Sequence, residues 1–297
     1  MGNDPQPRRP PTGRRREGGG GAGRRANLAS QRHAFAPDGG EDRPLSLPPT
    51  PDLPPAAAVA LLARGELRPI GRLLASSNNA LLCVVSGQLP GGEHPSPRLE
   101  APCVYKPIGG ERPLWDFPTG TLAYREVAAY ELSALAGWGI VPPTVLRDGP
   151  FGPGAVQLWI TPDPAVDRLA LVEAGDQRLR RIALFDAVVN NADRKIGHLL
   201  PLADGRILGV DHGVCFHVEP KLRTVLWHWR GCQLEPEERE HLAATAAALR
   251  GALGHRLGQL LSRAECRALE ERLTALLRSG RFPHPSPHWP AIPWPPY

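Results

Sequence analysis

The segment from Asn190 to Gly213, NNADRKIGHLLPLADGRILGVDHG, most constrains the fold, because it places two acidic turns at the ends of a short hairpin. Asp193 lies in the first turn, and Asp211 follows eighteen residues later, after a β-type run and before His-Gly. Between them, His198–Pro201 and Ile207–Val210 flank an Asp-Gly turn, which is typical of a two-stranded hairpin. We therefore expect the two carboxylates on adjacent loops.

Two neighbouring carboxylates suit a metal–nucleotide phosphotransfer site, where one orients a proton and the other holds Mg²⁺. Each residue also has a simpler interpretation. Asp193 could be a turn-capping Asp, and Asp211 an ordinary residue at a strand end. Lys195 either neutralises charge on the transferring phosphoryl group or is a solvated turn cation. His198 is either an unusual metal ligand or a neutral imidazole packed in the cleft.

The rare lysines carry a second signal. The chain has three lysines beside 32 arginines, so a retained lysine suggests a task for a compact point charge, such as binding a phosphate. Lys106 ends a β-type run, and Glu126 lies on the helix that follows. A strand lysine held by a helix glutamate is the arrangement of kinases, although a surface lysine and an unrelated helix carboxylate would give the same spacing.

The chain changes character three times. Residues 1–54 are rich in Gly, Pro and Arg and lack periodicity, which indicates a disordered tail. Residues 55–162 are β-rich with one long helix and are expected to bind the nucleotide, whereas residues 163–280 are mostly helical and carry the two acidic loops. Residues 281–297 are rich in Pro and Trp and form either a ligand for SH3 or WW domains or, as we favour, an extended segment packed onto the domain.

This order predicts an α+β protein with two lobes and a ligand cleft between them. Apolar periodicity and turn residues set the expected elements. The expected strands are Leu67–Ala75, Ala80–Ser86, Cys103–Lys106, Thr144–Leu146 and Ala155–Ile160. The expected helices are Pro55–Gly65, Thr121–Ala136, Asp176–Asn190, Pro236–Leu253 and Ser262–Ser279, the last capped by Ser262.

Composition narrows the function classes. No apolar run approaches the roughly 20 residues of a membrane span, and the N-terminus has no apolar segment typical of a secretory signal. The five scattered cysteines form no CxxC, so we expect reduced thiols and a cytoplasmic protein. Eight arginines in residues 1–32 account for the basic charge, and no aromatic residue lies among them, which argues against a nucleic-acid partner.

Taken together, VYKP, the helix containing Arg125-Glu126, NADRKIGH and VDHG resemble the phosphatidylinositol 3-/4-kinase-like superfamily, which includes the HipA-type kinases. The stretches VYKPIGGERPLWDFPTGTLAYREVAAYE and VPPTVLRDGPFGPGAVQ and the terminal PWPP are similar to an actinobacterial family described as SCO1664-like. The resemblance covers about residues 70–297 and implies a bilobal kinase-like fold with ATP in the cleft.

The resemblance also implies roles for individual residues. Asp193 would be the catalytic Asp, assisted by Lys195, and Asp211 would bind Mg²⁺ or, alternatively, Mn²⁺. Lys106 would contact the ATP phosphates and be held by Glu126. The remaining expected nucleotide-binding residues form a phosphate loop and a hinge for adenine, and they are Ser76, Ser77, Asn78, Asn79, Gln157, Trp159 and Ile160.

Two features depart from the superfamily pattern. His198 stands where the superfamily usually has a metal-binding Asn, and imidazole suits Mn²⁺ or Zn²⁺ better than Mg²⁺. The phosphate loop lacks the usual glycines. These departures leave a nucleotide-binding pseudokinase open beside an active kinase. The segment 216–230, equivalent to an activation segment, is compatible with a lipid, a protein or a small-molecule hydroxyl acceptor.

Overall fold

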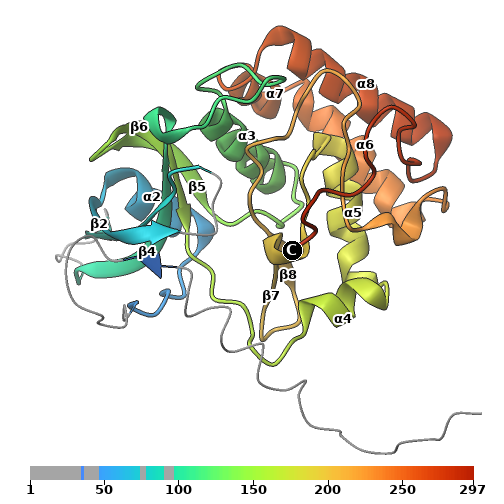
Figure 1. Cartoon of the computed structure of the whole chain (residues 1–297). Coiled ribbons are helices and arrows are strands. Elements are labelled where there is room, and N and C mark those ends of the chain that lie inside the picture. The colour runs from blue at the N-terminus through green and yellow to red at the C-terminus, as the bar shows by residue number, and fades with distance from the viewer. Residues whose placement is uncertain (1–34, 37–46, 74–77, 90–96) are drawn as a thin grey trace, which may run out of the picture.

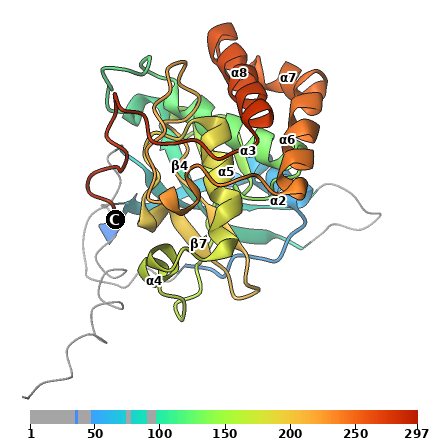
Figure 2. The same ribbon diagram turned by 90° about the vertical axis from the view of Figure 1, so that its right-hand side faces the viewer.

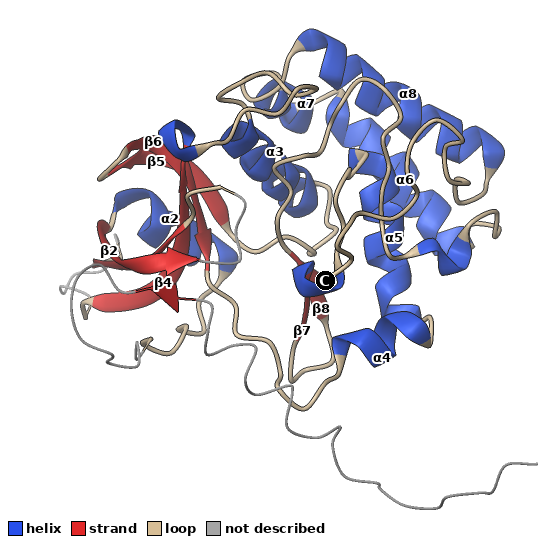
Figure 3. Cartoon of the chain, in the orientation of Figure 1, coloured by secondary structure: helices blue, strands red, loops and turns tan. Residues whose placement is uncertain are grey.

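The computed structural model describes residues 35–36, 47–73, 78–89 and 97–297 (Figure 1). Most of the predicted N-terminal tail, and both Ser76 and Ser77 of the predicted phosphate loop, lie outside these residues. The predicted α+β class is confirmed: an antiparallel sheet precedes a mostly helical part (Figure 3).

The sheet has the order β1-β2-β3-β4-β6-β5, and every neighbouring pair is antiparallel. Its strands are β1 (Phe35–Ala36), β2 (Glu66–Leu73), β3 (Leu81–Gly87), β4 (Leu99–Pro107), β5 (Thr144–Gly149) and β6 (Gly152–Leu158). The first five residues of β3 are buried in succession, as expected of a central strand covered on both faces. The strands β4 and β5 extend beyond their predicted limits, because residues 99–102 continue the pairing with β3 and residues 147–149 continue the pairing with β6.

Two helices connect the sheet to its surroundings. Helix α2 (Pro55–Arg64) begins with proline at its first position and contacts β3, β5 and β6 through a face that includes Leu61 and Leu62. Helix α3 (Leu122–Leu135) contacts β5 and β6 and, on its other side, α7. Because α3 lies between the sheet and the helical part, residues on it can reach both (Figure 1).

The helical part contains α4 (Arg168–Glu173), α5 (Arg180–Val189), α6 (Pro236–Leu249), α7 (Ala252–Leu257) and α8 (Arg263–Ser279). The prediction of one helix over Pro236–Leu253 is wrong, because the helix breaks at residues 250–251 between α6 and α7. The turn brings Gly254 of α7 so close to the Leu249 carbonyl that no side chain would fit there. Ser262 caps α8 as predicted, since its hydroxyl accepts from the Glu265 amide at 3.3 Å. Figure 2 shows α6, α7 and α8 together on one side of the molecule.

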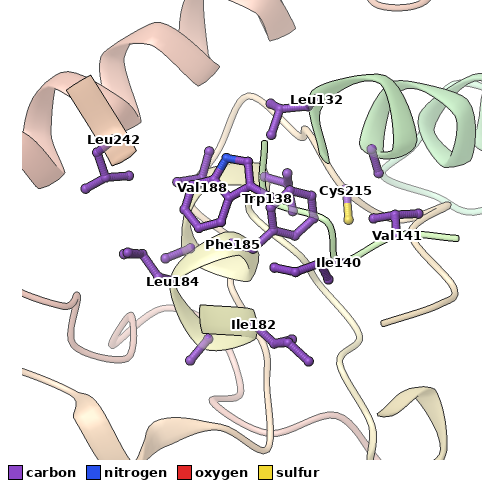
Figure 4. Close-up of a cluster of buried hydrophobic side chains, with 14 of the residues drawn as sticks. Leu132, Trp138, Ile140, Val141, Ile182, Leu184, Phe185, Val188, Cys215 and Leu242 are labelled. Atoms are coloured by element: carbon purple, nitrogen blue, oxygen red, sulfur yellow. The ribbon is translucent and has the colours of Figure 1, made fainter. Parts of the chain in front are cut away.

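A hydrophobic core holds these helices together (Figure 4). Trp138 lies at its centre, edge-on to Phe185 of α5 with ring centroids 5.5 Å apart. Its indole N–H donates to Thr245 Oγ1 at 3.1 Å, so the buried ring leaves no unpaired donor. The core fixes α5, and α5 leads directly into the first acidic loop.

The two acidic loops surround a small hairpin, β7 (Leu199–Pro201) with β8 (Ile207–Gly209), close to its predicted limits. The predicted packing of the C-terminal segment is also observed: the Ile196 amide donates to the Pro296 carbonyl at 2.9 Å. Among the residues described, no helix has the length and apolar character needed to cross a membrane.

Candidate active site

Lys106 is the organising cation of the site. It is the last residue but one of β4, and its ammonium donates to Glu126 Oε1 and, at 2.9 Å, to Asp211 Oδ1. Burial alone would lower the pKa of Lys106, but the carboxylates of Asp211 and Glu126 outweigh that effect and raise it. The ammonium is therefore fully charged at neutral pH and links the sheet, α3 and the second acidic loop.

Glu126 is the central residue of this link. Its side chain is 3% exposed, and its second oxygen accepts the backbone amide of His212 at 3.0 Å. Burial raises the pKa of Glu126, and the neighbouring Lys106 opposes the rise. One carboxylate thus fixes both the lysine and the backbone next to Asp211.

Asp211 adopts a left-handed backbone conformation, with φ of 63°. Asp tolerates this region better than most residues, and such conformations gather at functional sites. The charge of Lys106 lowers the pKa of Asp211, so the carboxylate is ionised. Half of the side chain is exposed to solvent, so an incoming cation could reach it.

Asp193 lies on the first acidic loop, which Asn190 and Asn191 shape. Asn190 ends α5 in the left-handed conformation, and its amide group donates to the carbonyls of His217 and Glu219 at 2.9 and 2.6 Å. Asn191 Oδ1 accepts the Asp193 amide at 2.9 Å. The two asparagines therefore fix the backbone from which the Asp193 side chain projects.

Lys195 pairs with Asp193, with Nζ 3.1 Å from Oδ2. Burial raises the pKa of Asp193, and Lys195 partly reverses that effect. The pair is partly exposed, with 33% of the Asp193 side chain accessible. A carboxylate in this position can accept a proton from a bound hydroxyl group.

Two residues that hold the acidic loops together could not be identified from the sequence: Arg194 and Asp186. Both side chains are fully buried, and the guanidinium makes two bonds to the carboxylate, at 2.9 and 2.8 Å. Arg194 also donates to the Val210 carbonyl at 2.8 Å and contacts His212 Nε2 at 2.8 Å. This ion pair joins the loop of Asp193 to the loop of Asp211. A charged residue on the apolar face of the predicted helix 176–190 was the signal available for Asp186.

His198 lies beside Asp211, with Nε2 3.3 Å from Oδ2. Its Nδ1 accepts the Lys195 amide at 3.4 Å, so the proton of the neutral ring is on Nε2 and faces the carboxylate. Burial lowers the pKa of His198 to about 4 against the attraction of Asp211, so the ring is neutral at pH 7. The structure thus brings His198 and Asp211 together, with Nε2 as a donor to the carboxylate.

A cavity of about 460 Å³ lies beside Lys106 and the two acidic loops, and its volume is within the range usual for small-molecule sites. Lys195 and His198 do not line it. Lys106, Glu126, Asp193 and Asp211 line it, and Asn78 and Asn79 of the predicted phosphate loop line its other wall. The Asn79 amide is held by the Gly110 carbonyl at 3.1 Å. The described part of the predicted phosphate loop therefore faces the lysine and both acids.

The predicted hinge residues do not line this cavity. Gln157 is buried in β6, where its side-chain amide donates to Thr144 Oγ1 at 2.8 Å. The Trp159 amide donates to the Pro102 carbonyl at 3.0 Å, and its carbonyl accepts from Thr50 Oγ1 at 2.9 Å. Ile160 is half-buried and packs against the core of the sheet. These contacts hold the hinge segment against β4 and the residues that precede α2.

The side chains near Asp211 could bind a cation that is also held by nucleotide phosphates, but they could not bind a cation by themselves. Within the described ranges, no three His, Cys, Asp or Glu side chains are grouped so that they could hold a metal by themselves. Mg²⁺ usually takes one or two carboxylates and fills its remaining positions with water and phosphate oxygens. Asp211 supplies a carboxylate of this kind.

The chain is similar to several known proteins. The chain is 42% identical to Protein Rv2133c of Mycobacterium tuberculosis (strain ATCC 25618 / H37Rv) over 271 residues, which cover 80% of this chain and 94% of that protein. It is 29% identical to phosphatidylinositol 4-kinase gamma 4 of Oryza sativa subsp. japonica over 154 residues, which cover 45% of this chain but 26% of that protein. The crystal structure of a Helicobacter pylori proinflammatory kinase, CtkA, is similar with a TM-score of 0.43 and 13% identity, over 74% of this chain and 94% of that one.

No family model matches the chain. The similarity to the mycobacterial protein runs through nearly the whole of that protein, at an identity well above the level at which relationship is in doubt. The chain therefore belongs to the same protein family as Rv2133c.

Proposed function

We propose that this protein is an ATP-dependent phosphotransferase that transfers the γ-phosphate of ATP to a hydroxyl acceptor. The observation that carries the proposal is the position of the Lys106 ammonium, bonded to Glu126 and Asp211 in the cavity that Asp193 also lines. A strand lysine, a helix glutamate and two loop carboxylates are the parts that phosphoryl transfer requires. The sequence similarity to a phosphatidylinositol 4-kinase supports the same class of reaction.

In this proposal each group has one task. Lys106 and the segment that contains Asn78 and Asn79 bind the phosphates of the nucleotide. Asp193 orients the acceptor hydroxyl and takes its proton as the new P–O bond forms and ADP leaves. Lys195 stabilises the charge on the transferring group, and Asp211 holds the metal ion, which supplies charge neutralisation when it is bound.

The proposal also covers the roles of the two main segments, the acceptor and the cellular location. Residues 55–162 would hold the nucleotide, and residues 163–280 would supply the acidic loops. The acceptor would be a lipid, a protein or a small molecule. A cytoplasmic location agrees with the five cysteines, which are all free thiols.

Nucleotide binding and turnover test the proposal directly. ATP with Mg²⁺ or Mn²⁺ should raise the melting temperature of the full chain, and the protein should consume ATP. Asp193→Ala should retain the stabilisation and lose the consumption, because Asp193 acts on the acceptor and not on the nucleotide. If ATP with either metal neither stabilises the protein nor is consumed, the proposal is contradicted.

A second candidate function is a pseudokinase that binds nucleotide without turnover. The contact of His198 with Asp211 favours it, because Nε2 donates to the carboxylate that would hold the metal. This candidate predicts stabilisation by ATP in the wild type and no ATP consumption that depends on Asp193. Consumption that disappears in Asp193→Ala would exclude it.

A further inference from the structure

Backbone hydrogen bonds connect the C-terminal segment to the first acidic loop through residues 223–225. The Arg223 amide donates to the Asn191 carbonyl at 2.9 Å, and the Val225 amide donates to the Arg194 carbonyl at 3.1 Å. Between them, the Thr224 amide points the other way and donates to the Ala291 carbonyl at 3.0 Å. The backbone beside Asp193 is therefore bonded to residues 223–225, and these in turn to the C-terminal segment.

The same segment contacts the first acidic loop directly. The Pro296 carbonyl accepts the amide of Ile196, the residue next to Lys195, at 2.9 Å. The Ala291 carbonyl accepts a second donor, Trp227 Nε1, at 2.8 Å. Both attachments lie within four residues of a side chain that lines the cavity, Asp193 in the first case and Arg223 in the second.

Trp289 anchors the segment at the mouth of the cavity. Its ring lies over the Lys221 ammonium, 4.5 Å from Nζ to the ring centroid, and Trp115 lies over the same ammonium at 4.8 Å. Asp116 pairs with this lysine at 2.8 Å, and the lysine side chain is 3% exposed. A desolvated ammonium held by two indole rings and a carboxylate joins three separate segments of the chain.

Trp289 and Lys221 also line the cavity that contains Lys106 and the two acids. Trp294, by contrast, is 86% exposed and lines no part of it. The two residues are of the same type, but only Trp289 lines the cavity, so Trp294 can serve as a matched control for substitutions of Trp289.

We propose that residues 289–296 are a positioning element of the phosphotransfer site, with Trp289 as the anchor that holds the loop of Asp193 in register. This inference rests on the proposed function for its effect on turnover. The segment supplies two backbone carbonyls and one aromatic wall, and without its anchor the loop of residues 191–197 loses an outer support. The Asp193 carboxylate would then sample positions from which it cannot accept the acceptor proton.

Hydrogen exchange on the full chain tests the positioning independently of any activity. In Trp289→Ala, amides of residues 191–197 and 221–227 should exchange about tenfold faster than in the wild type, as expected when a desolvated cation–π anchor is lost. Amides of α8 should be unchanged. Trp289→Phe, which keeps a ring against Lys221, should restore most of the protection, and Trp294→Ala should match the wild type. Unchanged exchange of residues 191–197 in Trp289→Ala would overturn the inference.

Turnover gives the second measurement. At saturating ATP, Trp289→Ala should consume ATP at least about tenfold more slowly than the wild type, with the KM for ATP changed by less than about threefold. A purely structural role would lower the melting temperature and leave the turnover of the folded protein unchanged, and that result would overturn the inference. A wild type that does not bind or consume ATP would refute the proposed function instead, and the exchange experiment would still decide the positioning role.

Discussion

Replacing Arg194 with leucine removes the buried cation that joins the two acidic loops. The substitution eliminates both bonds to Asp186 and the bond to the Val210 carbonyl, and it leaves a fully buried carboxylate with the Asn191 side-chain amide at 3.0 Å as its remaining side-chain partner. Breaking a buried ion pair from one side costs about 3–5 kcal/mol, because the remaining charge stays desolvated. We expect the free energy of unfolding to fall by that amount.

Urea denaturation followed by circular dichroism measures the loss. Arg256→Leu is the control, because Arg256 pairs with Glu131 at 2.8 Å on the surface, with 44% of its side chain exposed. An exposed pair of this kind contributes within about 1 kcal/mol. In the double variant Asp186→Leu with Arg194→Leu, much of the stability should return, because no unpaired charge remains in the core.

The functional consequence is separate from the stability. At temperatures where Arg194→Leu is still folded, it should bind ATP more weakly than the wild type, because the carbonyl of Val210 next to Asp211 is no longer held. Equal destabilisation by Arg194→Leu and Arg256→Leu would refute the assignment of Arg194 as the buried link.

Three further predictions follow from the site and the core. Lys106→Met should abolish the stabilisation by ATP, whereas Lys106→Arg should restore part of it, as melting temperatures with and without nucleotide will show. His198→Asn, which replaces a donor to Asp211 with an amide that can bind metal, should raise Mg²⁺-dependent ATP consumption, and no rise at any Mg²⁺ concentration would contradict a His198 ring protonated on Nε2. Burial lowers the pKa of His241 below its ordinary value, so the unfolded chain binds more protons and stability should fall as the pH drops below about 6.5; His241→Phe should make that decline shallower in urea denaturation at pH 5 and 7.5.

The sequence was informative where one local pattern decides the structure. The Asp-Gly turn predicts the β7–β8 hairpin, and Ser262 followed by Glu265 predicts the start of α8, because in both cases the residues that fix the conformation are neighbours in the chain. The break between α6 and α7 was missed for the opposite reason. Gly251 weakens a helix there without excluding one, and the close approach of Gly254 to Leu249 is visible only in three dimensions.

The candidate site also contains some residues that the sequence indicates and others that only the structure reveals. Lys106, Glu126 and Asp211 could be predicted because residue type, scarcity and order along the chain all indicated one chemistry, and the structure brings the three together. Arg194 could not be separated from Lys195, since both are cations in one polar turn and only burial distinguishes them. The cage around Lys221 joins residues 115, 221 and 289, which no sequence pattern connects.

Whether the site can turn over ATP depends on the proton that His198 Nε2 presents to the Asp211 carboxylate. The carboxylate accepts from the Lys106 ammonium on one oxygen and faces the His198 N–H on the other, so a metal ion must displace or share with both donors. Lys106 can turn toward phosphate, because nucleotide binding gives its charge a new partner. His198 has no such exchange available: its neutral ring is fixed by the Lys195 amide, and protonation is disfavoured by a pKa of about 4. For Mg²⁺ to gain both oxygens of Asp211, the ring must rotate away or change its tautomer, and the free energy of that step is subtracted from the affinity for the metal.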